Sequence, residues 1–367
     1  MKRYADILLM TLATFLMLTA CSVEVLRTAA DEQQQPILLS AAMQQSATRG
    51  GVFVADVQNY AFKENEVIDV FINENGGSSK TYSQPIFYMG TTARDSETDG
   101  KVYYALGNPR NSSNQQLTAA DVAWPSTNGI DIRAYHPTKA VTTLSGANTF
   151  TVQADQSTDA NYRKSDLMAA SRDNVARQDE RVQLTFRHLL SKVIITLRGD
   201  RSLNINHEGW RDGATVEQQT AAQAEANQKL IGATVRLLTI SPSITITPPT
   251  ALGTSATGTA QTITVGTIAA TTELVTSDDA TSAWQIACII PPQEIAASTA
   301  FVQVTMADGG VLTYKPDAKC TFSSGHANTY NLTVHAKELT LSGNPTIDPW
   351  TGGDTDQGHE TQPVITM

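Results

Sequence analysis

The stretch Arg181-Val-Gln-Leu-Thr-Phe-Arg-His-Leu-Leu-Ser-Lys-Val-Ile-Ile-Thr-Leu-Arg198 shows most clearly which class of fold this chain adopts. Apolar residues occupy alternate positions in each half of it, namely Val182, Leu184 and Phe186, then Val193, Ile195 and Leu197. Alternation with a period of two is typical of a half-buried β-strand. Because the parity slips by one residue between the halves, we expect a bulge or bend near Leu189–Leu190.

Short alternating segments of the same kind extend over most of the chain. They are rich in β-branched and aromatic residues and are separated by Gly, Asn, Pro or Asp. The sequence therefore predicts an all-β protein. The expected strands lie near residues 51–54, 67–72, 85–89, 101–105, 129–135, 149–152, 182–188, 193–197, 284–290, 301–306, 311–315 and 330–334.

The chain is long enough for two domains of ordinary size. Residues 165–180 are polar and lack alternation, so we place a boundary there and expect two tandem β-sandwiches, residues 50–178 and 179–342. Residues 217–230 are rich in Ala, Gln and Glu and predict one short inserted helix. Its weak apolar stripe indicates a surface insertion.

Between Arg236 and Glu273 the chain carries no charged residue. Two Thr-rich apolar segments, residues 244–246 and 263–265, predict hairpins in this stretch. Uncharged strand edges pair readily with other chains, which is a hazard for a monomer and useful to a protein that assembles.

The N-terminus has the pattern of a secretory signal. Lys2 and Arg3 precede an apolar run that ends in Leu18-Thr19-Ala20-Cys21. Small residues before a cysteine are what a lipoprotein signal peptidase requires, so residues 1–20 form the expected signal peptide and Cys21 the lipidation site. A simple signal peptide with an incidental cysteine is the alternative. The run is shorter than the roughly 20 apolar residues of a spanning helix.

The formal net charge is -10, and the acidic residues are scattered rather than clustered. A nucleic-acid-binding protein would show a basic stripe, which this sequence lacks. We therefore expect no nucleic-acid partner and a dispersed, soluble surface.

Besides Cys21 the chain has two cysteines, Cys288 and Cys320, each within an alternating segment. In an oxidising compartment they are candidates for a disulfide. Two buried free thiols are the alternative, because cysteine is often a small core residue. A zinc site would need more ligands at short spacing.

We expect no enzyme and no cofactor. The six histidines lack metal-ligand spacing, and no nucleophile elbow, P-loop or dinucleotide motif occurs. His136 and His188 are conceivable catalytic bases, but a histidine near a strand end more commonly makes one structural hydrogen bond. The acidic pair Asp278-Asp279 lies beside Ser and Thr and is better read as a solvated turn than as a glycosidase pair.

Two terminal segments attract attention. Arg49 stands among small residues in Ser46-Ala-Thr-Arg49-Gly50-Gly51, between the apolar knot 37–39 and the first expected strand, and suits a protease that cuts after arginine. Residues 343–367 form a Gly- and Asp-rich tail. This tail is either a disordered terminus or a partner-binding strand, with the apolar residues Ile347, Trp350, Val364 and Ile365 as candidate contacts.

Several motifs in order resemble the fimbrillin family, the subunits of type V pili of Bacteroidia. They are Gly129-Ile-Asp-Ile-Arg-Ala-Tyr-His-Pro137, Asp166-Leu-Met-Ala-Ala170, Leu184-Thr-Phe-Arg-His-Leu-Leu-Ser-Lys-Val193, Ile289-Ile-Pro-Pro-Gln293, Gly325-His-Ala-Asn-Thr-Tyr-Asn-Leu-Thr-Val334 and Ile347-Asp-Pro-Trp350. The resemblance extends over roughly residues 50–352 and implies sandwiches of the transthyretin-like, Greek-key kind.

The resemblance also implies a route to assembly. The chain would reach the outer membrane as a lipoprotein through Cys21, and an Arg-specific protease would cut the Arg49–Gly50 bond. Residues 21–49 would then be a propeptide with a removable strand. A C-terminal strand of a neighbouring subunit, with Ile347, Trp350, Val364 and Ile365 as donor side chains, would fill the groove by strand addition. A head-to-tail contact that does not close produces a filament.

Three functions are compatible with the sequence. The first is a structural pilus subunit that supports adhesion at the cell surface. The second is a pilus tip, an anchor or another surface lipoprotein that binds a glycan or a protein. The third is a secreted enzyme such as a glycosidase, for which the sequence nominates no residues.

Overall fold

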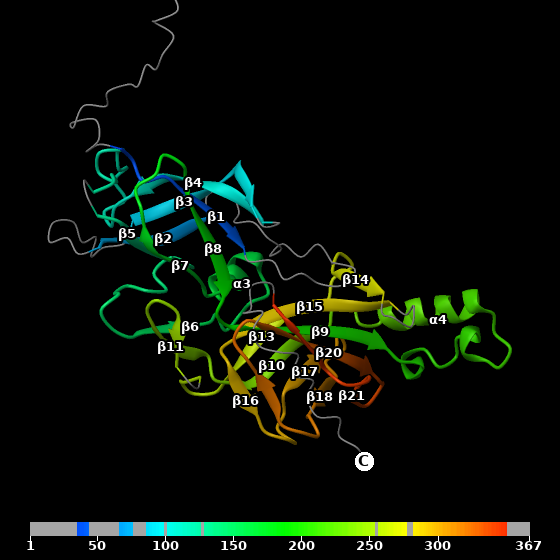
Figure 1. Ribbon diagram of the computed structural model, residues 1–367. Coiled ribbons are helices and arrows are strands. Elements are labelled where there is room, and N and C mark those ends of the chain that lie inside the picture. Colours follow the sequence, from blue (N-terminus) through cyan, green and yellow to red (C-terminus); the bar gives the residue numbers. More distant parts are fainter. Residues whose placement is uncertain are drawn as a thin grey trace, which may run out of the picture.

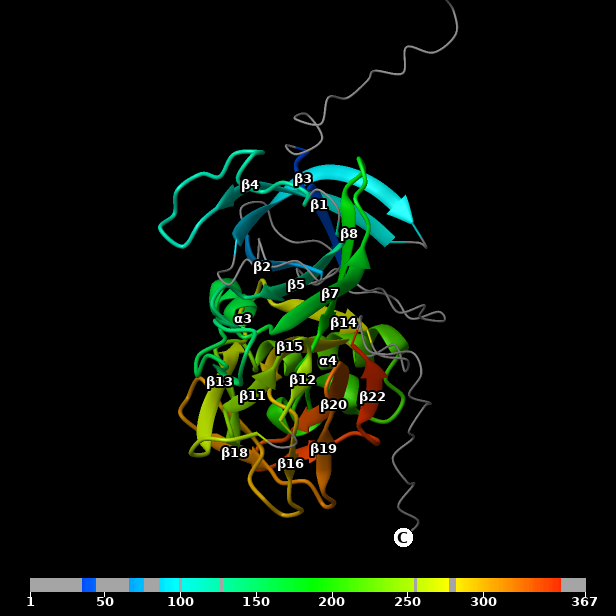
Figure 2. The same ribbon diagram turned by 60° about the vertical axis from the view of Figure 1, so that its left-hand side comes forward.

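The computed structural model describes residues 35–43, 66–75, 86–98, 101–125, 128–253, 256–276 and 282–350. Over these residues the protein is built mainly of β-strands, which confirms the all-β prediction. Figure 1 shows the strands in two groups, one above the other, with the chain crossing between them. The turned view in Figure 2 keeps the same two groups apart.

The first group is a closed barrel rather than the expected sandwich. The order of its strands around the barrel is β1-β4-β3-β2-β5-β7-β8. Alternation could not distinguish the two arrangements, because a barrel strand and a sandwich strand both have one inward face. The strands are β1 (Leu39–Met43), β2 (Val67–Glu74), β3 (Ile86–Thr98), β4 (Lys101–Arg110), β5 (Ile130–His136), β7 (Met168–Val175) and β8 (Val182–His188).

Strand β7 is one that the sequence did not predict. It lies inside the polar stretch 165–180, where four consecutive residues, 171–174, are exposed. Its buried residues come at its two ends instead of alternating, so the period of two is lost. β7 is aligned mainly by its pairing with β5, in which Ala169 lies opposite Tyr135 and Met168 lies opposite His136.

The second group contains several sheets that share one hydrophobic cluster. The largest sheet has the order β14-β15-β9-β20-β21, with β22 also paired to β20, and the four-stranded sheet has the order β13-β10-β17-β18. The strands of these two sheets are β9 (Ser191–Gly199), β10 (Thr234–Ile240), β13 (Gln261–Thr267), β14 (Glu273–Thr276), β15 (Ser282–Ile290), β17 (Val302–Thr305), β18 (Val311–Tyr314), β20 (His326–Val334), β21 (Leu339–Leu341) and β22 (Thr346–Pro349).

Smaller sheets complete this group. One has the order β12-β11-β6 and the other pairs β16 with β19. Their strands are β6 (Asn148–Thr151), β11 (Ser243–Thr247), β12 (Ala251–Leu252), β16 (Gln293–Ile295) and β19 (Cys320–Phe322). Of the two hairpins expected in the uncharged stretch, β11 and β12 form one. Strand β13 instead pairs with β10, so residues 263–265 belong to a different sheet.

The stretch 181–198 carries the chain from one group to the other. β8 ends at His188 in the barrel and β9 begins at Ser191 in the middle of the six-stranded sheet. The slip of parity at Leu189–Leu190 is therefore a change of sheet. The change of sheet follows β8, and β6, which precedes β8 in the chain, belongs to a sheet of the second group. The domain boundary at 178/179 stays a prediction.

Two α-helices occur among the described residues, α3 (Asp159–Lys164) and α4 (Val216–Gln228), with 3-10 turns at Arg201–Leu203 and Glu208–Trp210. Helix α4 confirms the predicted helix within two residues, and Thr215 and Gln218 form a capping box at its start. It projects to the right of the second group in Figure 1. Its buried residues are small, mainly Ala222 and Ala226, which agrees with a surface insertion.

Candidate functional site

Strand β1 closes the barrel by pairing on both of its edges. It runs antiparallel to β4, with Leu39 opposite Leu106, and parallel to β8, with Leu39 opposite Val182 and Met43 opposite Phe186. Residues 35–43 together with their contacts on β4, β8 and the loops beside them are called the β1 site below. Without β1 the barrel would have two unpaired strand edges, which are templates for another strand.

Both faces of β1 are buried. Leu39 and Ala41 belong to the hydrophobic cluster inside the barrel, and Ser40 and Ala42 on the opposite face are also buried. The hydroxyl of Ser40 has no hydrogen-bond partner. A buried polar group without a partner costs roughly 1–3 kcal/mol. The strand is therefore fully enclosed but not perfectly matched to its surroundings.

The residues just before β1 are bonded through their backbone to a loop and to the start of β8. Ile37 N–H donates to the carbonyl of Val122 at 2.9 Å, and Trp124 N–H donates to the carbonyl of Gln35 at 2.8 Å. Val182 N–H donates to the carbonyl of Leu38 at 2.8 Å. These bonds would form with any extended segment, since they use only the main chain.

The side chain of Gln35 makes specific polar contacts with the loop before β8. Its Nε2 donates to the carbonyl of Gln178 and to Oδ1 of Asp179, both at 2.7 Å, and its Oε1 accepts from Nε of Arg177 at 2.6 Å. Arg181 Nη1 donates to the carbonyl of Leu39 at 3.1 Å. These contacts were not predicted, because residues 177–180 lie in the polar stretch 165–180 that was interpreted as a domain boundary.

The apolar knot 37–39 is thus the start of the closing element, and the strand itself continues to Met43 through residues that were not predicted as strand. Cys21, Arg49, Gly50, Val364 and Ile365 lie outside the described residues, as does the strand expected at 51–54. The predictions about lipidation, cleavage and the last donor residues stay predictions.

The other two donor candidates are engaged within their own chain. Ile347 lies in β22, opposite Asn328 of β20. Trp350 is buried, and its ring stacks on that of His188 with a centroid distance of 3.7 Å and an interplanar angle of 10°. Trp350 N–H donates to the carbonyl of Gly325 at 2.7 Å. The tail therefore folds back at least as far as Trp350, because the indole gains burial by doing so.

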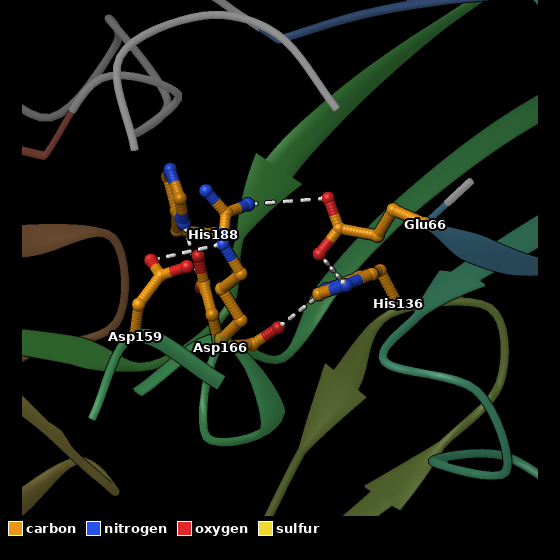
Figure 3. A network of polar contacts seen from close by, with 6 residues as sticks. Glu66, His136, Asp159, Asp166 and His188 are labelled. Carbon is orange, nitrogen blue, oxygen red and sulfur yellow. Dashed lines mark hydrogen bonds and ion pairs between the residues drawn. The ribbon is translucent and has the colours of Figure 1, made fainter. Parts of the chain in front are cut away.

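His188 and His136 belong to a polar network between the barrel and α3, drawn in Figure 3. His188 Nδ1 is 2.7 Å from Oδ1 of Asp166, and His136 Nδ1 is 3.1 Å from the backbone carbonyl of the same residue. His136 Nε2 lies 2.8 Å from Oε1 of Glu66, whose Oε2 accepts from Nη1 of Arg163 at 3.2 Å.

The electrostatics of this network favour a charged His136. Burial lowers the pKa of His136, but the hydrogen bond and the charge of Glu66, with Asp166, outweigh burial and hold that pKa above its ordinary value. The Asp166–His188 pair resembles the orienting half of a catalytic triad. His188 Nε2 is buried without a hydrogen-bond partner and Trp350 covers the ring face. The arrangement therefore suits a structural contact better than a reacting base.

Cys288 and Cys320 are both buried and free in the structure. Cys288 lies in β15 of the six-stranded sheet and Cys320 in β19 of the two-stranded sheet. This arrangement corresponds to the second of the two alternatives, separate thiols in the core. Burial raises the pKa of both thiols, and at Cys320 a hydrogen bond with Tyr330 opposes the effect of burial.

The described residues contain no group of three or more His, Cys, Asp or Glu side chains placed to hold a metal ion. No helix in the described part of the chain is long and apolar enough to cross a membrane. At the β1 site, the barrel holds the extended segment 35–43 on both of its edges and both of its faces. This site is the strongest candidate for function.

Comparisons with known proteins agree with the fold. A family model described as fimbrillin-like matches residues 54–350. A candidate cell adhesion protein from Bacteroides ovatus gives a TM-score of 0.56 at 16% identity, covering 86% of this chain and 98% of that one. Another from Bacteroides uniformis gives 0.53 at 15% identity, with the same coverage. Among curated proteins, none is significantly similar to this sequence.

Proposed function

Because the chain belongs to the fimbrillin-like family, we propose that it is a structural subunit of a type V fimbria that polymerises by exchange of strand β1. Membership of the family supports the broader role of a fimbrial subunit at the cell surface, assembling with other fimbrillin subunits. It also favours a protein without catalytic activity. Export as a lipoprotein, cleavage and strand exchange are the finer parts of the proposal.

The observation that carries the proposal is the double pairing of β1. This strand comes from residues upstream of Arg49, yet among the described strands it is the one that links β4 to β8 in the barrel. Cutting the Arg49–Gly50 bond would convert it from part of the chain into a bound peptide. Its departure would expose the barrel cluster along two strand edges, and a strand from a neighbour would restore both the hydrogen bonds and the buried apolar area.

The maturation route follows from the N-terminal sequence. Cys21 would be lipidated and would tether the precursor to the outer membrane, with β1 in place. An Arg-specific protease would then cut after Arg49. While β1 is covalently attached, its local concentration in the groove is high, so a neighbour cannot compete with it. Cleavage removes this advantage and makes assembly depend on processing.

The experiment compares two arginine variants in cells that make fimbriae. Arg49→Ala should leave residues 35–43 on the protein and block polymerisation while leaving the fold intact. Arg27→Ala is the matched control, because a cut at that position would leave β1 attached. N-terminal sequencing of protein shed from cells and electron microscopy of the filaments provide the readout. Filaments of normal length from Arg49→Ala would refute the cleavage step.

A tip or anchor subunit that binds a glycan or a protein is the second candidate. The folding back of Ile347 and Trp350 favours it, because a segment held on β20 is not free to act as a donor. Such a subunit would accept a strand without donating one, or would stay lipidated at Cys21. Purified fimbriae in which this protein retains an N-terminus at Cys21 and occurs only once per filament would support this candidate over the stalk subunit.

A further inference from the structure

Both faces of β1 are buried, but only one of them faces the interior of the barrel. Leu39 and Ala41 pack into the barrel cluster, whereas Ser40 and Ala42 lie on the outward face and are 0% and 2% exposed. The residues of a barrel strand alternate between the interior and the exterior, and the exterior side is usually the wetter one. Another part of the protein must therefore cover the outward face of β1.

The neighbouring strand β8 supplies side chains on this outward face. In and just before β8, Arg181, Gln183 and Thr185 lie on the side away from the interior, since the residues between them belong to the barrel cluster. In the register of β1 on β8, Gln183 lies opposite Ser40 and Thr185 lies opposite Ala42. These β8 side chains are thus placed directly beside the small residues of β1.

Two of these side chains reach across β1 to the strands beyond it. Thr185 Oγ1 lies 2.8 Å from Oη of Tyr103 in β4, within hydrogen-bond distance. Gln183 Nε2 donates to Oγ of Ser96 at 2.8 Å and to Oγ1 of Thr98 at 3.1 Å, and both acceptors lie in β3. Each contact joins strands that are separated by β1 in the order of the barrel.

Arg181 makes a third crossing near the start of β1. Its Nε lies 3.4 Å from Oδ1 of Asp95 in β3. Its Nη1 donates to the carbonyl of Leu39 at 3.1 Å and to the carbonyl of Leu106 at 3.5 Å. One guanidinium therefore contacts β1, β4 and β3 together. We call the contacts of Arg181, Gln183 and Thr185 with β3 and β4 the β8 strap.

The strap requires the end of β3 to fold over β1. In the order β8-β1-β4-β3, three strand spacings of about 4.8 Å would put β8 about 14 Å from β3 in a flat sheet, too far for Gln183 to contact Ser96. The register of β3 on β4 shifts between Gly90 and Arg94 and again before Ser96. Such bulges bend a strand. Figure 2 shows β3 as a long, strongly curved strand.

The residues of β1 beneath the strap are small. Larger side chains in place of Ser40 and Ala42 would occupy the space through which the side chains of Gln183 and Tyr103 cross, because protein interiors are closely packed. The hydroxyl of Ser40 has no hydrogen-bond partner. The strap thus covers β1 without bonding to the side chains beneath it.

We propose that the β8 strap gates the β1 site, so that β1 leaves the barrel only after the end of β3 has moved away from β8. Cleavage of the Arg49–Gly50 bond would make β1 a bound peptide but would break none of the strap contacts. Release of β1 is then a second step, and the strap sets its rate. The strap also limits the strand beneath it to small residues at the positions that face Gln183 and Thr185. The role of the strap in assembly rests on the proposed exchange of β1.

The first experiment measures hydrogen exchange in the uncut, full-length protein. Gln183→Ala removes the contacts with the end of β3, and Tyr103→Phe removes only the hydroxyl that contacts Thr185. Each change should raise the exchange rate of the amides of residues 39–43 about fivefold, which corresponds to the loss of about one hydrogen bond. Exchange in β5, which is not a neighbour of β1, should stay unchanged, because the opening is local.

Arg187→Ala is the matched control. Arg187 lies on the same face of β8, and its Nη2 donates to Oγ1 of Thr250 at 2.7 Å. It comes after Phe186, the last residue of β8 in the register with β1, so this change removes a hydrogen bond of β8 and leaves the strap closed. Exchange in β1 should match that of the unchanged protein. Equal increases in β1 and β5 in the strap variants, or an equal increase in β1 in the control, would overturn the proposal.

The second experiment follows the release of β1 after cleavage. The full-length protein is cut with an Arg-specific protease, and mass spectrometry confirms the cut after Arg49. Native mass spectrometry then measures, against time, the fraction of protein that still carries residues 35–43. The double variant Gln183→Ala/Tyr103→Phe should release this piece about 25-fold faster than the unchanged protein, the product of two independent fivefold effects.

The results separate the strap from the proposed function. If β1 leaves the unchanged protein and the double variant at the same rate, the strap is not a gate, although exchange of β1 stands. If the strap variants raise exchange and release of β1 while Arg49→Ala still forms normal filaments, the gate is supported and polymerisation through β1 falls.

A double-mutant cycle tests the requirement for small residues beneath the strap. Ala42→Leu places a larger side chain under the contact between Tyr103 and Thr185 and should separate them, with faster exchange in β1. In this variant Tyr103→Phe should have little further effect, because the hydrogen bond is already broken. Fully additive effects would show that the residue at position 42 does not act on the strap, and would overturn the restriction to small residues.

Discussion

Strands β1 and β22 both come from near the ends of the described chain, but they are held in different ways. β1 has a strand on each edge, and both of its faces are buried. β22 pairs with β20 on one edge, and three of its four residues are exposed. Its main attachment is the ring of Trp350, just beyond its end, on His188.

The difference shows what each segment contributes to stability. β1 is needed to close a barrel, so its loss exposes a hydrophobic cluster and two strand edges together. β22 is an edge strand that adds a few main-chain hydrogen bonds and one buried aromatic ring, so its loss leaves the sheet beneath it intact. A segment built into a closed sheet is expected to leave only when another strand replaces it, whereas an edge strand can detach alone.

The largest expected effect comes from introducing a charge into β1, compared with the same change in β22. Leu39→Asp places an unpaired carboxylate in the barrel core and should reduce the free energy of unfolding by more than about 4 kcal/mol. Ile347→Asp, the same kind of change on β22, should cost less than about 1 kcal/mol because the side chain is only half-buried. Urea unfolding of both variants provides the measurement. Similar losses would show that β1 is no more integral than β22.

The next effect concerns the attachment of β22. Trp350→Ala removes the ring that stacks on His188 and should destabilise the protein by about 3 kcal/mol. Trp350→Phe keeps an aromatic ring in that place and should recover most of the loss. Hydrogen exchange of the β20 amides that face β22 should rise in the alanine variant, while exchange in β1 should not change. Faster exchange in β1 would mean that the two segments are coupled.

A pH dependence should arise from the network that joins the barrel to this attachment. The folded-state pKa of His136 is raised, so its contribution to stability is complete below about pH 6.5, the unfolded value, and is lost as the pH rises through the folded-state pKa. Stability should therefore fall over that window. In Glu66→Gln the fall should be smaller, because the charge that raises the pKa of His136 is removed. An unchanged pH profile in the variant would contradict this assignment.

The smallest effect tests how well β1 fits. Ser40→Ala removes a buried hydroxyl that has no partner and should stabilise the uncut protein by about 1 kcal/mol. Thr346→Ala on β22 is the matched control, and as an exposed change it should stay within about 0.5 kcal/mol. Differential scanning calorimetry can resolve the two. A destabilised Ser40→Ala would show that the hydroxyl makes a contact after all, and β1 would then be better fitted than its contacts indicate.

Local pattern was sufficient to predict strands β2, β5, β8 and β9 close to their final bounds. Along β8 buried and half-buried residues alternate throughout, and β5 begins in the same way. In β2 and β9 most residues are buried, and their β-branched and other large apolar residues identified them instead. The same reasoning missed β7 and the end of β1. In β7 four exposed residues follow one another, and in β1 both faces are buried, so neither strand shows alternation.

The candidate site was foreseen only in outline. The resemblance to the fimbrillin family implied a removable strand before Arg49, and residues 37–39 do lead into the closing strand of the barrel. The contacts of Gln35 with Arg177 and Asp179 were not foreseen, because these two residues lie some 140 positions further along the chain, in a polar stretch with no pattern of its own.

By itself, the sequence determined most of the strand content, the helix and the family resemblance, because each depends on residues close together in the chain. Only the tertiary structure decided that the first sheet closes, that β1 closes it, and that Trp350 folds back onto His188. These are pairings between residues far apart in sequence, such as Leu39 with Val182. They depend on which edges and faces remain uncovered after all the strands have packed, and that is a property of the whole molecule.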